Sequence, residues 1–95
     1  MIFPSPITGK VPKIAKSAFI AENVTIIGDV TIHPNTNIWY GAVLRGDEGS
    51  LIIGENTSIQ EHVALHTEKG VTCKVGKNCI IGHHAMIHGP CVVED

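Results

Sequence analysis

Six of the 95 residues are histidines, and three of them have a spacing that suits metal binding. His83 and His88 lie five residues apart, and His66 precedes both. Neutral imidazole is a common ligand of zinc and other divalent transition metals, and three such ligands leave one coordination position open for water. These rings can hold one ion only if the surrounding elements bring them together.

A six-residue repeat of aliphatic side chains indicates what those elements are. Its runs are Ile20, Ile26, Ile32, Ile38 and Leu44; then Ile53, Ile59 and Leu65; then Val75, Ile81, Ile87 and Val93. A period of six fits neither an amphipathic α-helix nor a long alternating strand. It is typical of a hexapeptide-repeat parallel β-helix, in which three hexads close one triangular coil. The predicted fold is therefore all-β.

Two breaks in the repeat predict loops and assign the faces. Nine residues separate Leu44 from Ile53 and ten separate Leu65 from Val75, which predicts loops at 45–51 and 67–72. If each loop stays at its own corner, three columns of inward side chains follow. They are Ile32, Ile53, Val75 and Val93; Ile20, Ile38, Ile59 and Ile81; and Ile26, Leu44, Leu65 and Ile87.

We expect a single β-helical domain over 1–95, with an entry strand and cap at 1–18 and about four coils at 19–95. Within the entry segment, 11–14 is the stretch expected to be extended, because Pro and Gly limit pairing elsewhere. The sequence stops just after opening a new coil, without a recognisable C-terminal cap. We therefore expect it to be the first part of a longer protein.

The repeat also places the histidines. His66 and His88 hold the same outward position in adjacent coils, about 4.8 Å apart at the backbone. His83 lies on the neighbouring face, so it could join them only from a second chain, for example across a threefold axis. Stacked outward histidines could instead simply be solvated. We interpret His33, His62 and His84 as surface or interface residues; the last two share a column that could hold a metal weakly.

Composition excludes several classes of function. The net charge is −2 and the basic residues are scattered, so no nucleic-acid partner is expected. No apolar run approaches the roughly 20 residues of a membrane span, and the N-terminus lacks the features of a secretory signal. We expect a cytoplasmic protein whose Cys73, Cys79 and Cys91 are buried, reduced thiols.

Three segments resemble the γ-class carbonic anhydrase family and its carbonic-anhydrase-like hexapeptide relatives. They are Arg45-Gly46-Asp47-Glu48-Gly49, Ser58-Ile59-Gln60-Glu61 running on to His66, and Gly82-His83-His84-Ala85-Met86-Ile87-His88-Gly89. The resemblance implies a left-handed β-helix that forms a homotrimer. It also implies one metal, zinc first and iron or cobalt as alternatives, held by His66 and His88 of one subunit and His83 of its neighbour.

The same resemblance implies roles for four further residues. Arg45 and Asp47 match a pair that joins subunits near the metal, although such a pair could be only a surface contact. Gln60 matches a glutamine near the metal-bound water, and Glu48 matches an acidic residue linked to catalysis. Two departures stand out. The loop 67–70 is short where family enzymes carry a longer acidic loop, and the later coils and C-terminal helix are missing.

Reversible hydration of carbon dioxide to bicarbonate is the function that the resemblance implies. Nothing in three histidines specifies carbon dioxide, so hydrolysis of a small ester or thioester would use the same chemistry. The alternatives are a catalytically inactive trimeric module that binds metal at its interface, and a hexapeptide acyltransferase with a histidine base.

Overall fold

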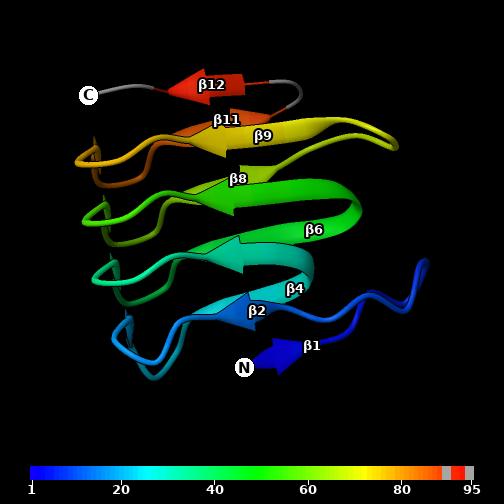
Figure 1. Ribbon diagram of the computed structural model, residues 1–95, viewed down its shortest axis with the longest axis horizontal. Helices are drawn as coiled ribbons and strands as arrows, with labels where there is room; N and C mark the ends of the chain where they lie inside the picture. Colours follow the sequence, from blue (N-terminus) through cyan, green and yellow to red (C-terminus); the bar gives the residue numbers. More distant parts are fainter. Residues whose placement is uncertain (89–90, 94–95) are drawn as a thin grey trace.

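The computed structural model describes residues 1–88 and 91–93, and it winds as a parallel β-helix (Figure 1). This described part contains strands and turns but no helix. Its strands are β1 (Ile2–Phe3), β2 (Lys13–Ile14), β3 (Phe19–Ile20), β4 (Thr25–Ile32), β5 (Asn37–Ile38), β6 (Val43–Ile53), β7 (Ser58–Ile59), β8 (Ala64–His66), β9 (Thr72–Val75), β10 (Ile80–Ile81), β11 (Met86–His88) and β12 (Cys91–Val93).

Two sheets make the walls of the coil, and every strand pair in them is parallel. One sheet has the order β10-β7-β5-β3 and forms a single face. The other follows the path β1-β4-β6-β8-β11, with β2 paired to β4, β9 paired to β6, and β12 paired to β9. Because β4 and β6 are long and bend, this second sheet wraps two faces of the prism (Figure 1).

The three predicted columns are confirmed by the backbone register. Ile32 pairs with Ile53, which pairs with Val75, and Val75 with Val93. The other columns align in the same way, from Ile20 to Ile81 and from Ile26 to Ile87. The central members of each column are fully buried. The side chain of Val93 lies outside the described residues.

The expected loop at 45–51 is wrong, because strand β6 continues through it from Val43 to Ile53. A single residue of β4, Asp29, stands opposite the four residues 47–50 of β6. Contacts hold this extra length against the coil: Ser50 Oγ donates a hydrogen bond to Asp29 Oδ2 at 2.8 Å. Gly49 lies so close to the 67–71 loop that a Cβ there would collide with backbone oxygens. The second predicted loop is present between β8 and β9.

The tight turns at the corners of the coil contain residues that tolerate a left-handed backbone conformation, with positive φ. Asn35, Asn56 and Asn78 stack at one corner with φ near +60°, and His62 and His84 do so at another, above Gly41. Asparagine and histidine are enriched among the few residues that adopt this conformation without being glycine. The rings of His62 and His84 stack with centroids 5.1 Å apart and planes 9° apart.

The cysteines depart from the expectation of three reduced thiols. Cys79 is buried and its Sγ lies 3.4 Å from the backbone oxygen of Lys77, whereas Cys73 is disulfide-bonded. The backbone of Cys73 pairs with that of Cys91, one coil later. The side chain of Cys91 lies outside the described residues.

No helix in the part of the chain that the structure describes could cross a membrane.

Replacing the buried Ile59 with Ala tests the core register. Ile59 is fully buried and pairs with strands on both sides, so we expect the free energy of unfolding to fall by about 2–5 kcal/mol. Urea denaturation measures the change. The control is Ile7→Ala in the N-terminal segment, where the side chain is 62% exposed and a change within about 0.5 kcal/mol is expected. Equal losses for the two variants would contradict the register.

Candidate metal centre

The predicted backbone column of His66 and His88 is present. Strands β8 and β11 pair in parallel, and their register sets His88 directly opposite His66. One coil earlier, Arg45 of β6 pairs with His66, so the three residues follow one line up the same sheet. The side chain of His88 lies outside the described residues. The column is therefore defined by the backbone register, and of its two imidazole rings the structure describes that of His66.

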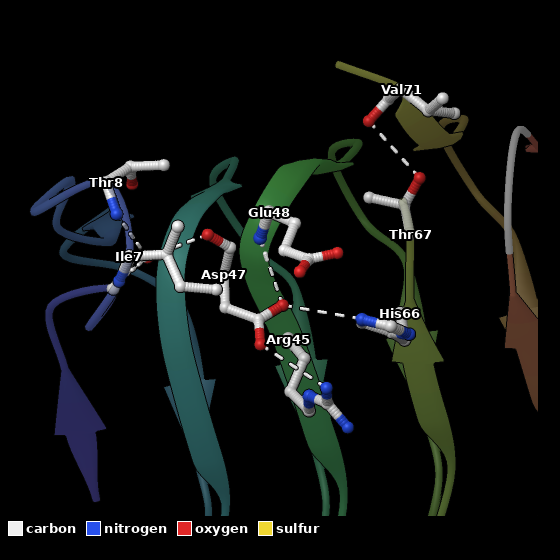
Figure 2. Close-up of polar contacts among 9 residues, drawn as sticks. Ile7, Thr8, Arg45, Asp47, Glu48, His66, Thr67 and Val71 are labelled. Carbon is white, nitrogen blue, oxygen red and sulfur yellow. Dashed lines mark hydrogen bonds and ion pairs between the residues drawn. The ribbon is translucent and has the colours of Figure 1, made fainter. Parts of the chain in front are cut away.

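Asp47 is the centre of the polar contacts around His66 (Figure 2). Its Oδ1 accepts a hydrogen bond from the backbone N–H of Glu48 at 3.0 Å and lies 3.4 Å from His66 Nε2. Its Oδ2 accepts a hydrogen bond from Arg45 Nη2 at 3.3 Å. Burial raises the pKa of the Asp47 carboxyl, but the charge and hydrogen bond of Arg45, with the two N–H groups of Asp47 and Glu48, lower it overall. Asp47 is therefore an anion beside an imidazole.

The N-terminal segment packs against strand β6, which carries Asp47, from outside the coil. Ser5 is 4% exposed, and its hydroxyl donates to the backbone oxygen of Asp47 at 2.7 Å. Ser5 Oγ itself accepts hydrogen bonds from the backbone N–H groups of Ile7 and Thr8 (Figure 2). Beneath it, a Cβ at Gly28 would collide with Gly46. Residues 42 positions apart in sequence thus fix the backbone from which the Asp47 carboxylate extends.

A second polar cluster lies on the other sheet. His83 lies in the turn between β10 and β11, and its Nδ1 is 2.8 Å from Oε1 of Glu61. Both belong to a shallow groove lined by Asn37, Trp39, Ser58, Gln60, Glu61 and His83. Trp39 closes one wall: its Nε1 donates to Asn37 Oδ1 at 2.7 Å, and its ring packs against Phe19 at a centroid distance of 5.0 Å.

The candidate residues thus separate into two groups within one chain. Arg45, Asp47, Glu48 and His66 surround one position on the eight-stranded sheet, and Gln60 and His83 share a groove on the four-stranded sheet. Among the described side chains, no three His, Cys, Asp or Glu residues converge on one point that could hold a metal ion.

Two contacts of the site were missed from the sequence. Glu61 was named only inside a motif, although it lies one coil below His83 at the same distance after an inward isoleucine. That shared phase was the signal that could have found it. No pattern in the sequence marks Trp39 as a wall of the His83 groove.

Comparisons with known proteins give the family. A family model described as bacterial transferase hexapeptide (six repeats) matches residues 12–46. Gamma carbonic anhydrase 3, mitochondrial, of Arabidopsis thaliana is 41% identical over 92 residues, which cover 90% of this chain and 35% of that protein. A probable carbonic anhydrase of Methanocaldococcus jannaschii is 44% identical over 82 residues, which cover 86% of this chain and 51% of that protein.

The chain belongs to the hexapeptide-repeat family of γ-class carbonic anhydrases and their relatives. Its coil is accordingly the left-handed β-helix, and membership implies a metal cofactor without identifying the metal. The chain spans about one third to one half of the length of the curated relatives described above.

Transferase names also occur among similar structures. The crystal structure of a hexapeptide transferase family protein from Anaplasma phagocytophilum matches with a TM-score of 0.84 at 42% identity, covering 93% of this chain and half (50%) of that one. The similar proteins thus share the fold and carry names from two classes of reaction.

Replacing Ser5 with Ala should loosen the strand that carries Asp47. The variant removes a buried hydroxyl that donates one hydrogen bond and accepts two, so we expect unfolding in urea to become easier by about 1–3 kcal/mol. Ser17→Ala is the matched control, because its hydroxyl accepts a single exposed N–H, that of Asn35. A loss at Ser5 no larger than that at Ser17 would refute the role of the N-terminal segment.

Proposed function

We propose that this chain forms a homotrimer that holds one divalent metal at each subunit interface and hydrates carbon dioxide reversibly to bicarbonate. The observation that carries the proposal is the division of the histidines. His66 and His88 share a column on one sheet, whereas His83 lies with Gln60 on another. Only a neighbouring chain could bring the second group to the first, and relatives named carbonic anhydrases support that reaction.

Exposed apolar side chains beside both groups support a subunit contact. Met86 is 80% exposed and lines a hollow with Arg45 and His66. On the other sheet, Ile80 is 71% exposed and Tyr40, adjacent to Trp39, is 49% exposed. Large apolar side chains grouped at a surface are a frequent mark of protein interfaces. The proposed trimer would cover them while it assembles the site.

The donor set suits a divalent transition metal. In the proposal His66, His88 and the neighbour's His83 are the ligands, with zinc preferred and iron or cobalt as alternatives, since imidazole binds all three. Such a metal, when bound, supplies a Lewis acid that makes a water-derived nucleophile available at neutral pH. Asp47 and Glu61 fit the pattern in which a carboxylate contacts a metal-ligating histidine.

The remaining residues have distinct roles in this proposal. The amide of Gln60, next to His83 in the groove, orients the nucleophile by a hydrogen bond. The carboxylate of Glu48, exposed on the same strand as Asp47, receives the released proton and passes it to solvent. Arg45 keeps Asp47 ionised and in place, and extends the contact towards the neighbouring chain.

Two other functions use the same fold. A trimer that binds metal only to hold its interface would keep the ligands and lack activity. Acyl transfer is favoured by the transferase names among similar proteins, and it needs a histidine base rather than a metal. Stopped-flow carbon dioxide hydration, measured together with metal content, separates the three. Carbon dioxide hydration that requires bound metal supports the proposal. Bound metal without hydration favours the inactive trimer, and the absence of both favours acyl transfer.

Mixing two inactive variants tests whether the site spans two chains. His66→Ala and His83→Ala should each lose most bound zinc, because two imidazoles hold zinc less well than three. After subunit exchange at equal amounts, about a quarter of the interfaces should join an intact His66–His88 pair to an intact His83, by random assortment in a cyclic trimer. Zinc content should recover by about that fraction.

The control for this experiment is His62→Ala, because His62 points into a different column. That variant should keep its zinc alone and in mixtures. If exchange is verified with differently tagged chains and zinc content does not recover, the histidines do not divide between chains as proposed.

A further inference from the structure

The shortest ion-pair contact among the described residues joins Glu61 to His83. Oε1 of Glu61 is 2.8 Å from Nδ1 of His83, which is a short, direct hydrogen-bond distance. His83 is the candidate ligand on the four-stranded sheet. Glu61 has no role in the function proposed so far beyond its place beside that ligand.

The backbone fixes how these two side chains meet. Glu61 follows Ile59 by two residues, His83 follows Ile81 by two residues, and the two isoleucines pair in register. Gln60 N–H donates to the oxygen of Ile81 at 3.1 Å, and His84 N–H donates to the oxygen of Glu61 at 3.0 Å. These hydrogen bonds lie on either side of the pair. The carboxylate and the imidazole therefore start from adjacent points of a defined ladder.

The chemistry of the contact selects one form of the imidazole. A neutral histidine carries a proton on one ring nitrogen and a lone pair on the other, and an ionised carboxylate only accepts hydrogen bonds. With Glu61 at Nδ1, the proton must lie on Nδ1 and the lone pair on Nε2. A metal can bind only the nitrogen that has the lone pair, so the tautomer decides which ring nitrogen is presented.

We propose that Glu61 is a positioning residue that holds His83 as the Nδ1-protonated tautomer and so presents Nε2 as a metal ligand. The role of this tautomer in metal binding rests on the proposed function. The tautomer itself follows from the Glu61–His83 contact in the metal-free chain. Glu61 would act through His83 and would not contact the metal or the substrate.

The opposite interpretation is a surface ion pair without consequence. The side chains of His83 and Glu61 are 61% and 39% exposed, and such pairs contribute little to folding. The two interpretations differ in what a substitution changes. A surface pair affects neither the tautomer nor metal affinity, whereas a positioning residue affects both and leaves unfolding nearly unchanged.

Two substitutions of Glu61 separate the effect of its charge from the effect of its hydrogen-bond acceptor. Glu61→Gln keeps an oxygen that can accept from Nδ1 but removes the charge, and Glu61→Leu removes the acceptor at similar size. Loss of such a carboxylate partner weakens metal binding by about 10- to 100-fold in known sites. We expect a weakening in that range for Glu61→Leu and a smaller one for Glu61→Gln. Glu22→Gln is the matched control, because Glu22 holds the same outward position of the repeat two coils earlier.

The deciding measurement is made on the metal-free protein. Nitrogen-15 NMR of labelled imidazoles at about pH 8.5, where histidine is neutral, distinguishes the two tautomers, and the His83 signals are assigned by their loss in His83→Ala. We expect the Nδ1–H form in the wild type and in Glu22→Gln. In Glu61→Leu, a shift towards the Nε2–H form is expected.

Zinc affinity, measured by competition with a chelator, gives the second readout. A wild-type His83 that is mainly Nε2–H would overturn the inference, as would a Glu61→Leu variant with unchanged tautomer and unchanged zinc affinity. If wild type and His83→Ala bind zinc equally, the proposed metal site fails, and the NMR result still decides the role of Glu61 separately.

Discussion

In-register parallel hydrogen bonding between coils is the constraint on which the rest of the structure depends. Each residue on a face stacks on the residue one coil away, at the spacing of neighbouring β-strands, about 4.8 Å. Aliphatic side chains therefore fill the interior column by column, from Ile20 to Ile81 and from Ile26 to Ile87. The same ladder sets outward side chains beside each other, which is how His66 and His88 come to one column and Glu61 and His83 to another.

That ladder tolerates extra residues only where other contacts hold them. The extra length of β6 stays extended because Ser50 bonds to Asp29, Ser5 bonds to the backbone of Asp47, and glycine permits close packing. A flexible loop at this point would give the Asp47 carboxylate many positions, and ordering it on binding would cost conformational entropy. The buried hydroxyl of Ser5 removes much of that freedom before any ligand arrives. The N-terminal segment is thus part of the candidate site although it lies far from the histidines in sequence.

The sequence predicted the fold well because one physical period governs it. Every inward column followed from the spacing of six, once two insertions were assigned to corners. The same period could have revealed Glu61 beside His83 and Cys73 beside Cys91, since both pairs lie one coil apart. Neither pair forms a short sequence motif, because its members are 22 and 18 residues apart in the sequence.

Other features could not come from the repeat at all. The extended course of β6 depends on Ser5, a residue outside the periodic segment, so no local pattern predicts it. The groove wall formed by Trp39 depends on rotamers of Trp39 and Phe19, which are set by packing. The predicted triad is a different case. The backbone positions of the three histidines were predictable from the period. Whether their side chains meet at one ion depends on a second chain and on the side chain of His88, which lies outside the described residues.

A three-sided prism explains why the candidate ligands of one chain separate. Its faces turn away from one another, so groups on different faces diverge and cannot reach one ion from the same coil. Under the proposed assembly, the outward residues of one face meet those of a different face on the neighbour, a heterologous contact that closes around a threefold axis. Metal binding and association would then be linked, because an ion held by both chains stabilises the trimer by mass action. The carboxylates of Asp47 and Glu61 belong to the single chain, so each chain would bring its histidines already oriented and leave only docking to complete the site.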